Sequence, residues 1–158
     1  MDKEDKLMRY IGRITRCSNF YRARMLSDVG LSGVQCPYLT RIARQPGISQ
    51  DELAGQLYKD KSVVARHLAT LQQLGFIRRE PSPVDRRVQQ IYPTEKTHQV
   101  LPRILKVFAD WEAELTSGFT EEEREDALSL LIRMYENAER VTDSLRGQED
   151  TGKGGSGR

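Results

Sequence analysis

The fold of this protein is decided by residues 60–94, which read DKSVVARHLATLQQLGFIRREPSPVDRRVQQIYPT. In the first half of this stretch, apolar residues recur at intervals of three and four, which predicts a helix from about Lys61 to Leu74. The second half holds two short segments typical of β-strands, FIRRE and VQQIY, on either side of a turn that contains two prolines. A helix followed by a β-hairpin is therefore expected. The residues of this helix that should face the core are Val64, Leu68 and Leu71.

A shorter helix, from about Gln50 to Tyr58, is predicted just before this one, and only Lys59 and Asp60 separate the two. Its start has the Ser49-x-x-Glu52 spacing of a capping box, in which side chains satisfy free backbone N–H groups. Two helices joined this closely form a helix-turn-helix, to which the hairpin adds a wing. One α-helix fits the major groove of B-DNA, and a basic hairpin beside it can reach the neighbouring minor groove. The pattern predicts a reader of nucleic acid.

Four further helices are predicted around this motif. Three have bounds of about 6–29, 33–44 and 121–146, and the fourth begins near Thr94. The capping-box spacing recurs at Ser32 and Thr120. Two of the helices contain a proline, which removes a backbone hydrogen bond and should kink the helix. These prolines are Pro37 and Pro102.

The first, fifth and sixth helices carry long apolar stripes, and little of the chain is left to cover them. Dimerisation with a second copy of the chain is the simplest way to bury these stripes, although an intramolecular helical bundle would also bury them. We expect a mainly α protein with a small β-hairpin, in which a winged helix-turn-helix region spans 31–93. A helical dimerisation region would comprise 1–30 and 94–146. Residues 147–158, GQEDTGKGGSGR, should form a disordered tail because they are polar and rich in glycine.

Charge is distributed unevenly along the chain, although the net charge is only +2. Residues 59–87 contain seven cations and three anions, a balance of +4. Residues 112–146 contain four cations and ten anions, a balance of −6. A basic middle beside an acidic end predicts one surface for a polyanion and another that avoids it.

Candidate DNA contacts lie on the outward face of the helix that starts at Lys61 and on the hairpin, although a solvated helix face would also explain the helix residues. At the hairpin tip the prolines stiffen the loop, and Asp85 can pair with either following arginine and aim its guanidinium. An exposed ion pair adds only ~0–1 kcal/mol to stability, so contacts with phosphates or a minor groove explain the arginines better. The candidate DNA-binding residues are Lys61, Ser62, Ala65, Arg66, Arg79, Asp85, Arg86 and Arg87.

The stretch from Asp60 to Thr94 resembles the recognition helix and wing of the MarR family of bacterial transcription regulators, and residues 30–54 fit the part that leads into it. The segment LGFIRR and the tip sequence Asp-Arg-Arg carry the resemblance. It implies a winged-helix homodimer, joined through its N- and C-terminal helices, that binds a pseudo-palindromic double-stranded DNA operator. Such a protein acts as a repressor that small, often aromatic, ligands displace. The helix residues would then contact the major groove or phosphates, and Arg86 or Arg87 would enter the minor groove.

Three residues depart from the family pattern. Pro93 stands where the family usually has leucine and Thr97 where it usually has glycine, so the connection from the wing to the next helix should be set differently. Pro37 is unusual in a region that commonly lines the ligand pocket of the family.

Two mechanisms could control DNA binding by the protein. A small aromatic or phenolic effector could occupy an apolar cleft that contains one cation. Cys17 could instead act as a redox sensor, because it shares a helix face with Tyr21, similar to the branch of the family that senses organic hydroperoxides. An ordinary buried cysteine is the simpler explanation. Candidate effector-binding residues, which are equally well explained as core aromatics and a surface arginine, are Arg16, Tyr21, Tyr38, Phe108 and Trp111.

Other classes of protein find little support. The sequence has no glycine-rich phosphate loop, no Gly-x-Ser-x-Gly turn and no His-Glu-x-x-His, so no enzymatic activity and no cofactor are expected. No cluster has the spacing of metal ligands. The chain lacks both a membrane-length apolar run and a signal peptide, which predicts a cytoplasmic protein. The remaining rival is a winged-helix module that uses its hairpin for protein contacts and binds no operator.

Overall fold

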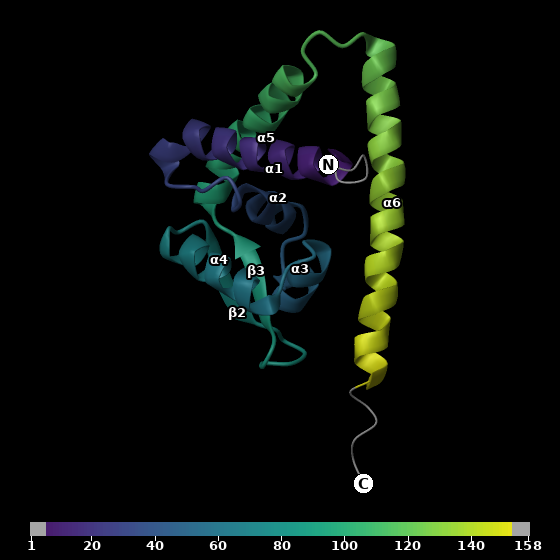
Figure 1. Cartoon of the computed structure of the whole chain (residues 1–158). Helices are drawn as coiled ribbons and strands as arrows, with labels where there is room; N and C mark the ends of the chain where they lie inside the picture. The colour runs from purple at the N-terminus through teal and green to yellow at the C-terminus, as the bar shows by residue number, and fades with distance from the viewer. Residues whose placement is uncertain (1–5, 153–158) are drawn as a thin grey trace. The chain divides into compact units, whose positions relative to one another are not determined.

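A computed structural model describes residues 6–152, with side chains to residue 146 (Figure 1). It is mostly helical with one small sheet, which confirms the expected fold class. The chain divides into two compact units between Ala113 and Glu114. The elements in chain order are α1 (Lys6–Met25), η2 (Ser27–Val29), α2 (Cys36–Arg44), β1 (Ile48–Ser49), α3 (Gln50–Gln56), α4 (Lys61–Gln73), β2 (Ile77–Pro81), β3 (Gln89–Pro93), α5 (Glu95–Leu115) and α6 (Glu121–Gly152).

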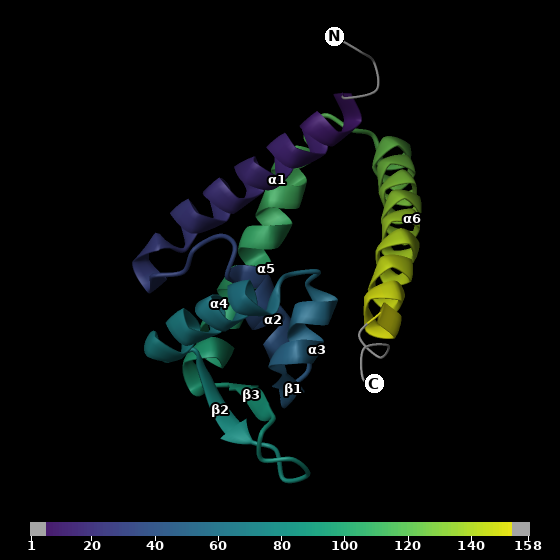
Figure 2. The ribbon, with the colours of Figure 1, turned by 60° about the horizontal axis from the view of Figure 1, so that its bottom comes forward.

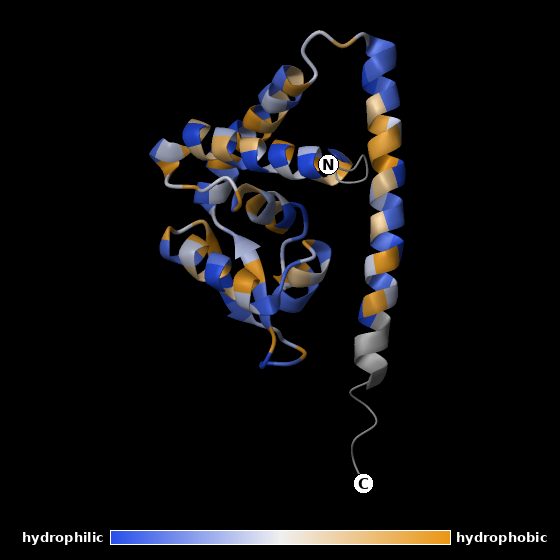
Figure 3. Ribbon diagram, in the orientation of Figure 1, coloured by the Kyte–Doolittle hydropathy of each residue, from blue (hydrophilic) through white to orange (hydrophobic). Residues whose placement is uncertain are grey.

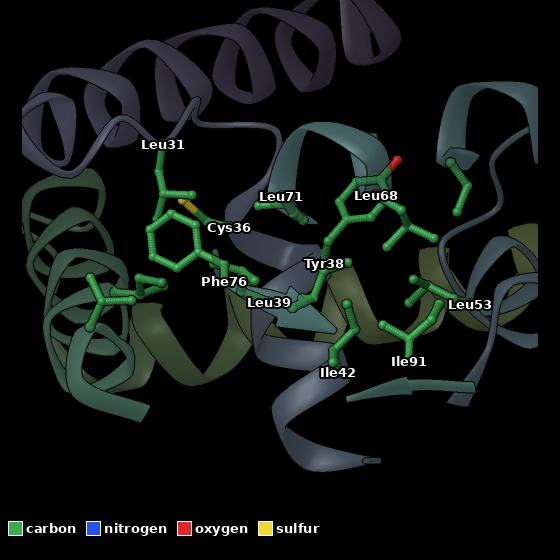
Figure 4. Close-up of a cluster of buried hydrophobic side chains, with 14 of the residues drawn as sticks. Leu31, Cys36, Tyr38, Leu39, Ile42, Leu53, Leu68, Leu71, Phe76 and Ile91 are labelled. Atoms are coloured by element: carbon green, nitrogen blue, oxygen red, sulfur yellow. The ribbon is translucent and has the colours of Figure 1, made fainter. Parts of the chain in front are cut away.

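The core of the first unit lies between α2, α3, α4 and the sheet, as the close-up in Figure 4 shows. The three residues of α4 that were predicted to face inward are fully buried there, which confirms that prediction. The N-terminal half of α5 closes one side of this core with Val100 and Ile104. The apolar spacing of α4 thus decides which of its sides faces the protein. The largest fully buried side chains include Leu39, Ile42, Leu53, Leu68, Leu71, Phe76 and Ile91.

The sheet has three antiparallel strands in the order β1-β3-β2. The two predicted strands are present as β2 and β3, paired from Ile77↔Pro93 to Pro81↔Gln89. The expected hairpin gains a third strand, because Ile48 of β1 pairs with Ile91 of β3. A strand of two residues shows no alternation of polar and apolar residues, so the sequence contained no signal for β1.

Several helix bounds differ from the expected ones. The first α-helix ends at Met25, and its last expected residues form the 3₁₀ helix η2. The second begins at Cys36 rather than Gly33, because residues 32–35 form a turn in which the Ser32 N–H donates to Gln35 Oε1 at 3.0 Å. The sixth continues past Arg146 to Gly152, so the first part of the expected tail is helical. Residues 153–158 of that tail lie outside the described residues.

The two prolines have milder effects than expected. Pro37 lies in the first turn of α2 rather than inside the helix. A backbone N–H has no partner within the helix at that position, so a proline there costs nothing and produces no kink. Pro102 does lie inside α5, yet the helix continues through it from Glu95 to Leu115.

The loop before α2 passes very close to α1. A Cβ added at Gly33 would overlap the backbone carbonyl of Asn19, so only glycine allows this approach. Arg103 of α5 fixes the end of the same helix, because it donates to Asp28 (2.6 and 2.7 Å) and to the Met25 carbonyl (2.6 Å). These contacts place α1 against the winged-helix core.

We expect Gly33→Ala to lower the free energy of unfolding by about 1–3 kcal/mol, because the added methyl group has no space. The matched control is Gly12→Ala within α1, where the added Cβ would lie 3.4 Å from Arg16 Nη1. That variant should be neutral or stabilising by about 0.5–1 kcal/mol, because alanine favours a helix interior. Urea denaturation followed by circular dichroism measures both. Equal stability of the two variants would show that the close approach at Gly33 does not exist.

Candidate nucleic-acid interface

The helix-turn-helix is formed by α3 and α4. At the start of α3, Ser49 Oγ accepts from the Glu52 N–H, and Glu52 Oε2 accepts from the Ser49 N–H at 2.8 Å, so the predicted capping box is confirmed. At its end Tyr58 takes a left-handed conformation with φ 50°. The Lys59 N–H then donates back to the Ala54 carbonyl at 3.1 Å, which closes the tight turn into α4.

The predicted outward residues of α4 lie on its open side. Ser62 and Arg66 are exposed, and Ala65 is half-buried. Lys61 is also exposed, and its Nζ lies 2.7 Å from Asp51 Oδ2 of α3. This face of α4 therefore offers a hydroxyl, a methyl group and two cations at the same side of the helix, which are groups that read base edges or bind phosphates.

Side chains from the start of α5 hold the other end of α4. Lys96 Nζ donates to the Leu74 carbonyl at 2.7 Å and Thr94 Oγ1 to the Gly75 carbonyl at 2.6 Å. The buried Thr97 donates its hydroxyl to the Phe76 carbonyl, which also accepts from the Thr94 N–H at 3.0 Å. Thr97, which stands where the family usually has glycine, thus uses its hydroxyl for a contact that glycine could not make. The last carbonyl groups of a helix have no partner within it, and here α5 supplies the partners.

The wing is the loop between β2 and β3, which projects from the sheet at the bottom of Figures 1 and 2. The Ser82 N–H donates to the Val88 carbonyl at 2.8 Å across its base. At its tip Asp85 binds Arg87 and not Arg86: Asp85 Oδ1 accepts from the Arg87 Nε at 3.1 Å and from its backbone N–H at 3.0 Å. The bond from the Arg87 side chain and that from its backbone hold the pKa of Asp85 below its usual value.

Arg87 nevertheless remains available to a ligand. Its side chain is 91% exposed despite the bond to Asp85. A carboxylate that accepts two donors of one guanidinium restricts its rotamers and fixes its direction. Arg86, which is exposed as well, has no such support among the described residues. The structure therefore distinguishes the two arginines that the sequence could not.

Arg78 and Arg79 lie on opposite faces of the sheet, because neighbouring strand residues alternate. Arg78 forms an ion pair with Glu80 and lies over the Tyr92 ring, 4.6 Å from its centroid. Arg79 pairs in register with Ile91, and its Nε is buried without a hydrogen-bond partner. A cavity of about 400 Å³ adjoins Arg79, and its lining residues are Ser49, Gln50, Asp51, Arg79, Arg87, Val88 and Gln89.

The five candidate effector-binding residues do not form one site. Three of them, Arg16, Tyr21 and Trp111, line an open apolar cavity of about 610 Å³ on the face of α1 and α5. Tyr38 instead lines a second cavity of about 320 Å³ between α1, α2 and the helix-turn-helix. Phe108 lines neither cavity; it packs against the core, with the Arg22 guanidinium 5.1 Å from the centre of its ring.

The second cavity brings to the predicted Tyr38 three groups that the sequence did not indicate as binding residues, namely Arg22, Lys59 and His67. Tyr38 Oη is buried without a hydrogen-bond partner, and burial raises the pKa of Tyr38. His67 of α4 lies against it, with ring centroids 5.1 Å apart. Burial, then Arg66 and Lys59, lower the pKa of His67. Arg22 and Lys59 also line this cavity; they are far apart in sequence, so no spacing pattern joins them.

The two cysteines have different environments. Cys17 is exposed and lines the apolar cavity of α1 and α5 together with Tyr21, so it is not the buried core cysteine of the simpler explanation. Cys36 is buried at the start of α2, and burial raises the pKa of its thiol to about 11. Cys36 is therefore protonated and unreactive at neutral pH.

None of the helices described between residues 6 and 152 combines the length and the apolar character needed to cross a membrane.

Comparison with known proteins agrees with this geometry. The profile of the MarR family matches residues 31–88. The chain is 35% identical to the HTH-type transcriptional regulator YybA of Bacillus subtilis over 85% of its own length and 89% of that protein. It is also similar to a crystal structure of MarR (37% identity, TM-score 0.83, covering 91% of this chain and 98% of that one).

A further similar structure is that of a MarR family transcriptional regulator from Listeria monocytogenes in complex with a 26mer DNA. The identity is 27% and the TM-score 0.80, and the match covers 96% of each chain. The relatives match the helices on both sides of the winged helix as well as the winged helix itself. The chain therefore belongs to the MarR family of transcriptional regulators.

Proposed function

We propose that two copies of this protein bind one pseudo-palindromic DNA operator, with each α4 in the major groove and each wing in the adjacent minor groove. The observation that carries this proposal is the arrangement of two basic elements side by side. The exposed face of α4 adjoins a hairpin whose Arg87 is held outward by Asp85. A helix fits the major groove, and the negative potential of a narrow minor groove attracts arginine. Such a regulator acts in the cytoplasm, where bacterial DNA lies.

Arg87→Ala should weaken binding by about 1–3 kcal/mol, because it removes the guanidinium that the wing places in the groove. Arg86→Ala should weaken it less, because Arg86 is not fixed by Asp85. The probe is a duplex recovered by the wild-type protein from a randomised library, and fluorescence anisotropy measures affinity. The matched control is Arg133→Ala on α6, which removes the same charge from a part of the sequence outside the winged-helix region 31–93.

Unchanged affinity of both wing variants would exclude the wing from DNA binding. Wild-type affinity should also fall steeply as salt rises, because binding releases the cations condensed on DNA. Failure to recover any duplex would favour the rival function, a winged-helix module for protein contacts.

A homodimer is supported by the apolar residues that recur along α1 and α6 (Figure 3), many of which are exposed within their own unit. None of the residues of α1 is buried. On α6, Leu131 and Tyr135 are each 55% exposed, and their neighbours on the same stripe are exposed too. The helices also have opposite charges: α1 has six cations and no anion, and α6 has four cations and ten anions. A second copy can bury both faces and bring the opposite charges together.

Leu131→Glu should convert the dimer to monomers, because it places a charge in the apolar stripe of α6 that the second copy would cover. The control is Ser129→Glu, which adds the same charge on the opposite, polar side of this helix. Size-exclusion chromatography with light scattering measures the mass of each. If Leu131→Glu remains a dimer, α6 does not contribute to the interface. If the wild type is monomeric, the proposed mode of operator binding is wrong.

Release by a small aromatic acid is supported by the cavity between α1, α2 and the helix-turn-helix. Two cations, Arg22 and Lys59, line it, and the unpaired Tyr38 hydroxyl is a ready donor. A carboxylate would accept from these groups, and an aromatic ring would pack beside Tyr38 and His67. Because His67 belongs to α4, a ligand here would contact the recognition helix and could shift it, which makes the protein a ligand-released repressor.

Tyr38→Phe should weaken binding of a benzoate or salicylate probe about fivefold to tenfold, because one charge-assisted hydrogen bond is lost. Its free energy of unfolding should be unchanged or higher, since a buried hydroxyl without a partner is removed. Tyr21→Phe, in the other cavity, is the matched control and should bind normally. Isothermal titration calorimetry measures both. Equal affinity of the two variants would exclude this cavity as the effector site.

A thiol switch at Cys17 stays the alternative mode of release, supported by the exposure of that thiol. It differs from ligand release in one respect: peroxide would release DNA from the wild type and not from Cys17→Ser.

A further inference from the structure

The cavity beside Arg79 lies between the start of α3 and the base of the wing. We infer that it binds a single backbone phosphate of DNA and that Arg79 is the residue that holds it. This inference rests on the proposed mode of DNA binding and adds to it the group that fixes the register of the protein along the duplex. Arg79 is one of the DNA contacts predicted from the sequence, where nothing separates its role from that of the wing tip.

The position of the cavity agrees with the path of a DNA strand. A major groove and the neighbouring minor groove are separated by one sugar–phosphate backbone. If α4 occupies the first groove and the wing occupies the second, that backbone has to pass between them. The first helix of a helix-turn-helix crosses the backbone, and here that helix is α3, whose residues Ser49, Gln50 and Asp51 form one wall of the cavity.

The polar groups of the cavity favour an anion. Arg79 and Arg87 contribute two guanidiniums, and Gln50 and Gln89 contribute amide groups that can donate. The one carboxylate of the lining, Asp51, is neutralised by Lys61, whose Nζ lies 2.7 Å from Asp51 Oδ2. Arg87 is already bound to Asp85, so Arg79 supplies the charge that is not yet paired.

Arg79 itself is prepared for such a contact. It pairs with Ile91 in the sheet, and Ile91 pairs on its other side with Ile48, so the stem of Arg79 lies along the edge of the core. Within residues 6–146 its side chain makes no hydrogen bond or ion pair, and its Nε is buried without a partner. A buried donor without an acceptor is unfavourable, and a phosphate oxygen would satisfy it. An arginine can give two parallel hydrogen bonds to one phosphate.

The neighbouring Arg78 provides a matched control. It carries the same charge one residue away on the same strand, but it lies on the opposite face, paired with Glu80 and stacked on Tyr92. A general effect of positive charge on DNA binding would make Arg78 and Arg79 equivalent. A phosphate site in the cavity makes only Arg79 important.

The test measures the salt dependence of binding to a random-sequence 30-base-pair duplex. Each complex of two copies contains two Arg79 side chains, so Arg79→Gln should bind about a hundredfold more weakly at about 0.1 M salt. Its slope of log K against log salt should become about 1.8 less steep, twice the value of about 0.9 for one phosphate. Arg78→Gln should keep the wild-type slope. Arg79→Lys should keep the slope but lose part of the affinity, because lysine retains the charge without the planar fork. Equal slopes for Arg79→Gln and Arg78→Gln would overturn the inference.

A second measurement does not depend on any variant folding. Single phosphates of the duplex recovered from the randomised library are replaced, one at a time, by uncharged methylphosphonates. One replacement on the strand between the two occupied grooves should weaken wild-type binding about tenfold and Arg79→Gln binding less than about twofold. Equal losses in both proteins at every position would overturn the inference and leave DNA binding itself intact. If the wild type recovers no duplex, the proposed function fails instead.

Discussion

The hydrogen bonds from the start of α5 to the end of α4 are the contact on which the DNA-binding geometry depends. Thr94, Lys96 and Thr97 satisfy three successive carbonyl groups, those of Leu74, Gly75 and Phe76. The chain enters β2 immediately afterwards, so these bonds fix both the end of α4 and the starting point of the β2–β3 hairpin. A displacement of α5 therefore moves α4 and the wing together.

The same contact explains how a change far from DNA could reach it. Arg103 joins α5 to the end of α1 through Asp28 and the Met25 carbonyl. From α5 the path continues to α4 through the hydrogen bonds of Thr94, Lys96 and Thr97, of which only that of Thr97 is buried. Packed contacts of this kind adopt a few discrete arrangements rather than a continuous range. A second copy that covers α1 would act on the first end of this path. A ligand between α1 and α4 would contact both of its ends.

The two cavities of the first unit show how differently similar residues can be used. The larger cavity contains Tyr21 and Trp111, whose rings are 5.1 Å apart, and it opens on an almost wholly apolar face. The smaller one contains Tyr38 with an unpaired hydroxyl, beside two cations. An open apolar face suits burial against another protein, whereas a less open cavity that has a free hydroxyl and two cations in a mainly apolar lining suits a small aromatic acid. Both cavities contain aromatic residues and an arginine, so the types of residue alone do not tell a protein-binding face from a site for a small acid.

The sequence by itself determined the features that depend on neighbours a few residues apart. The inward face of α4 follows from the spacing of Val64, Leu68 and Leu71, and the starts of α3 and α6 follow from the capping boxes at Ser49 and Thr120. The resemblance of residues 60–94 to the recognition helix and wing of the MarR family likewise depends only on the order of residues within that stretch.

Tertiary structure alone decided what depends on residues distant in sequence. Strand β1 forms because Ile48 pairs with Ile91, which lies more than 40 residues later in the chain. The pairing of β2 with β3 places Arg78 and Arg79 on opposite faces of the sheet. The choice of Arg87 over Arg86 by Asp85 and the division of the aromatic residues between two cavities depend on how the backbone folds around them. Hydrogen bonds and packing contacts act over a few ångströms, so a site built from several elements forms only when the chain has brought those elements together.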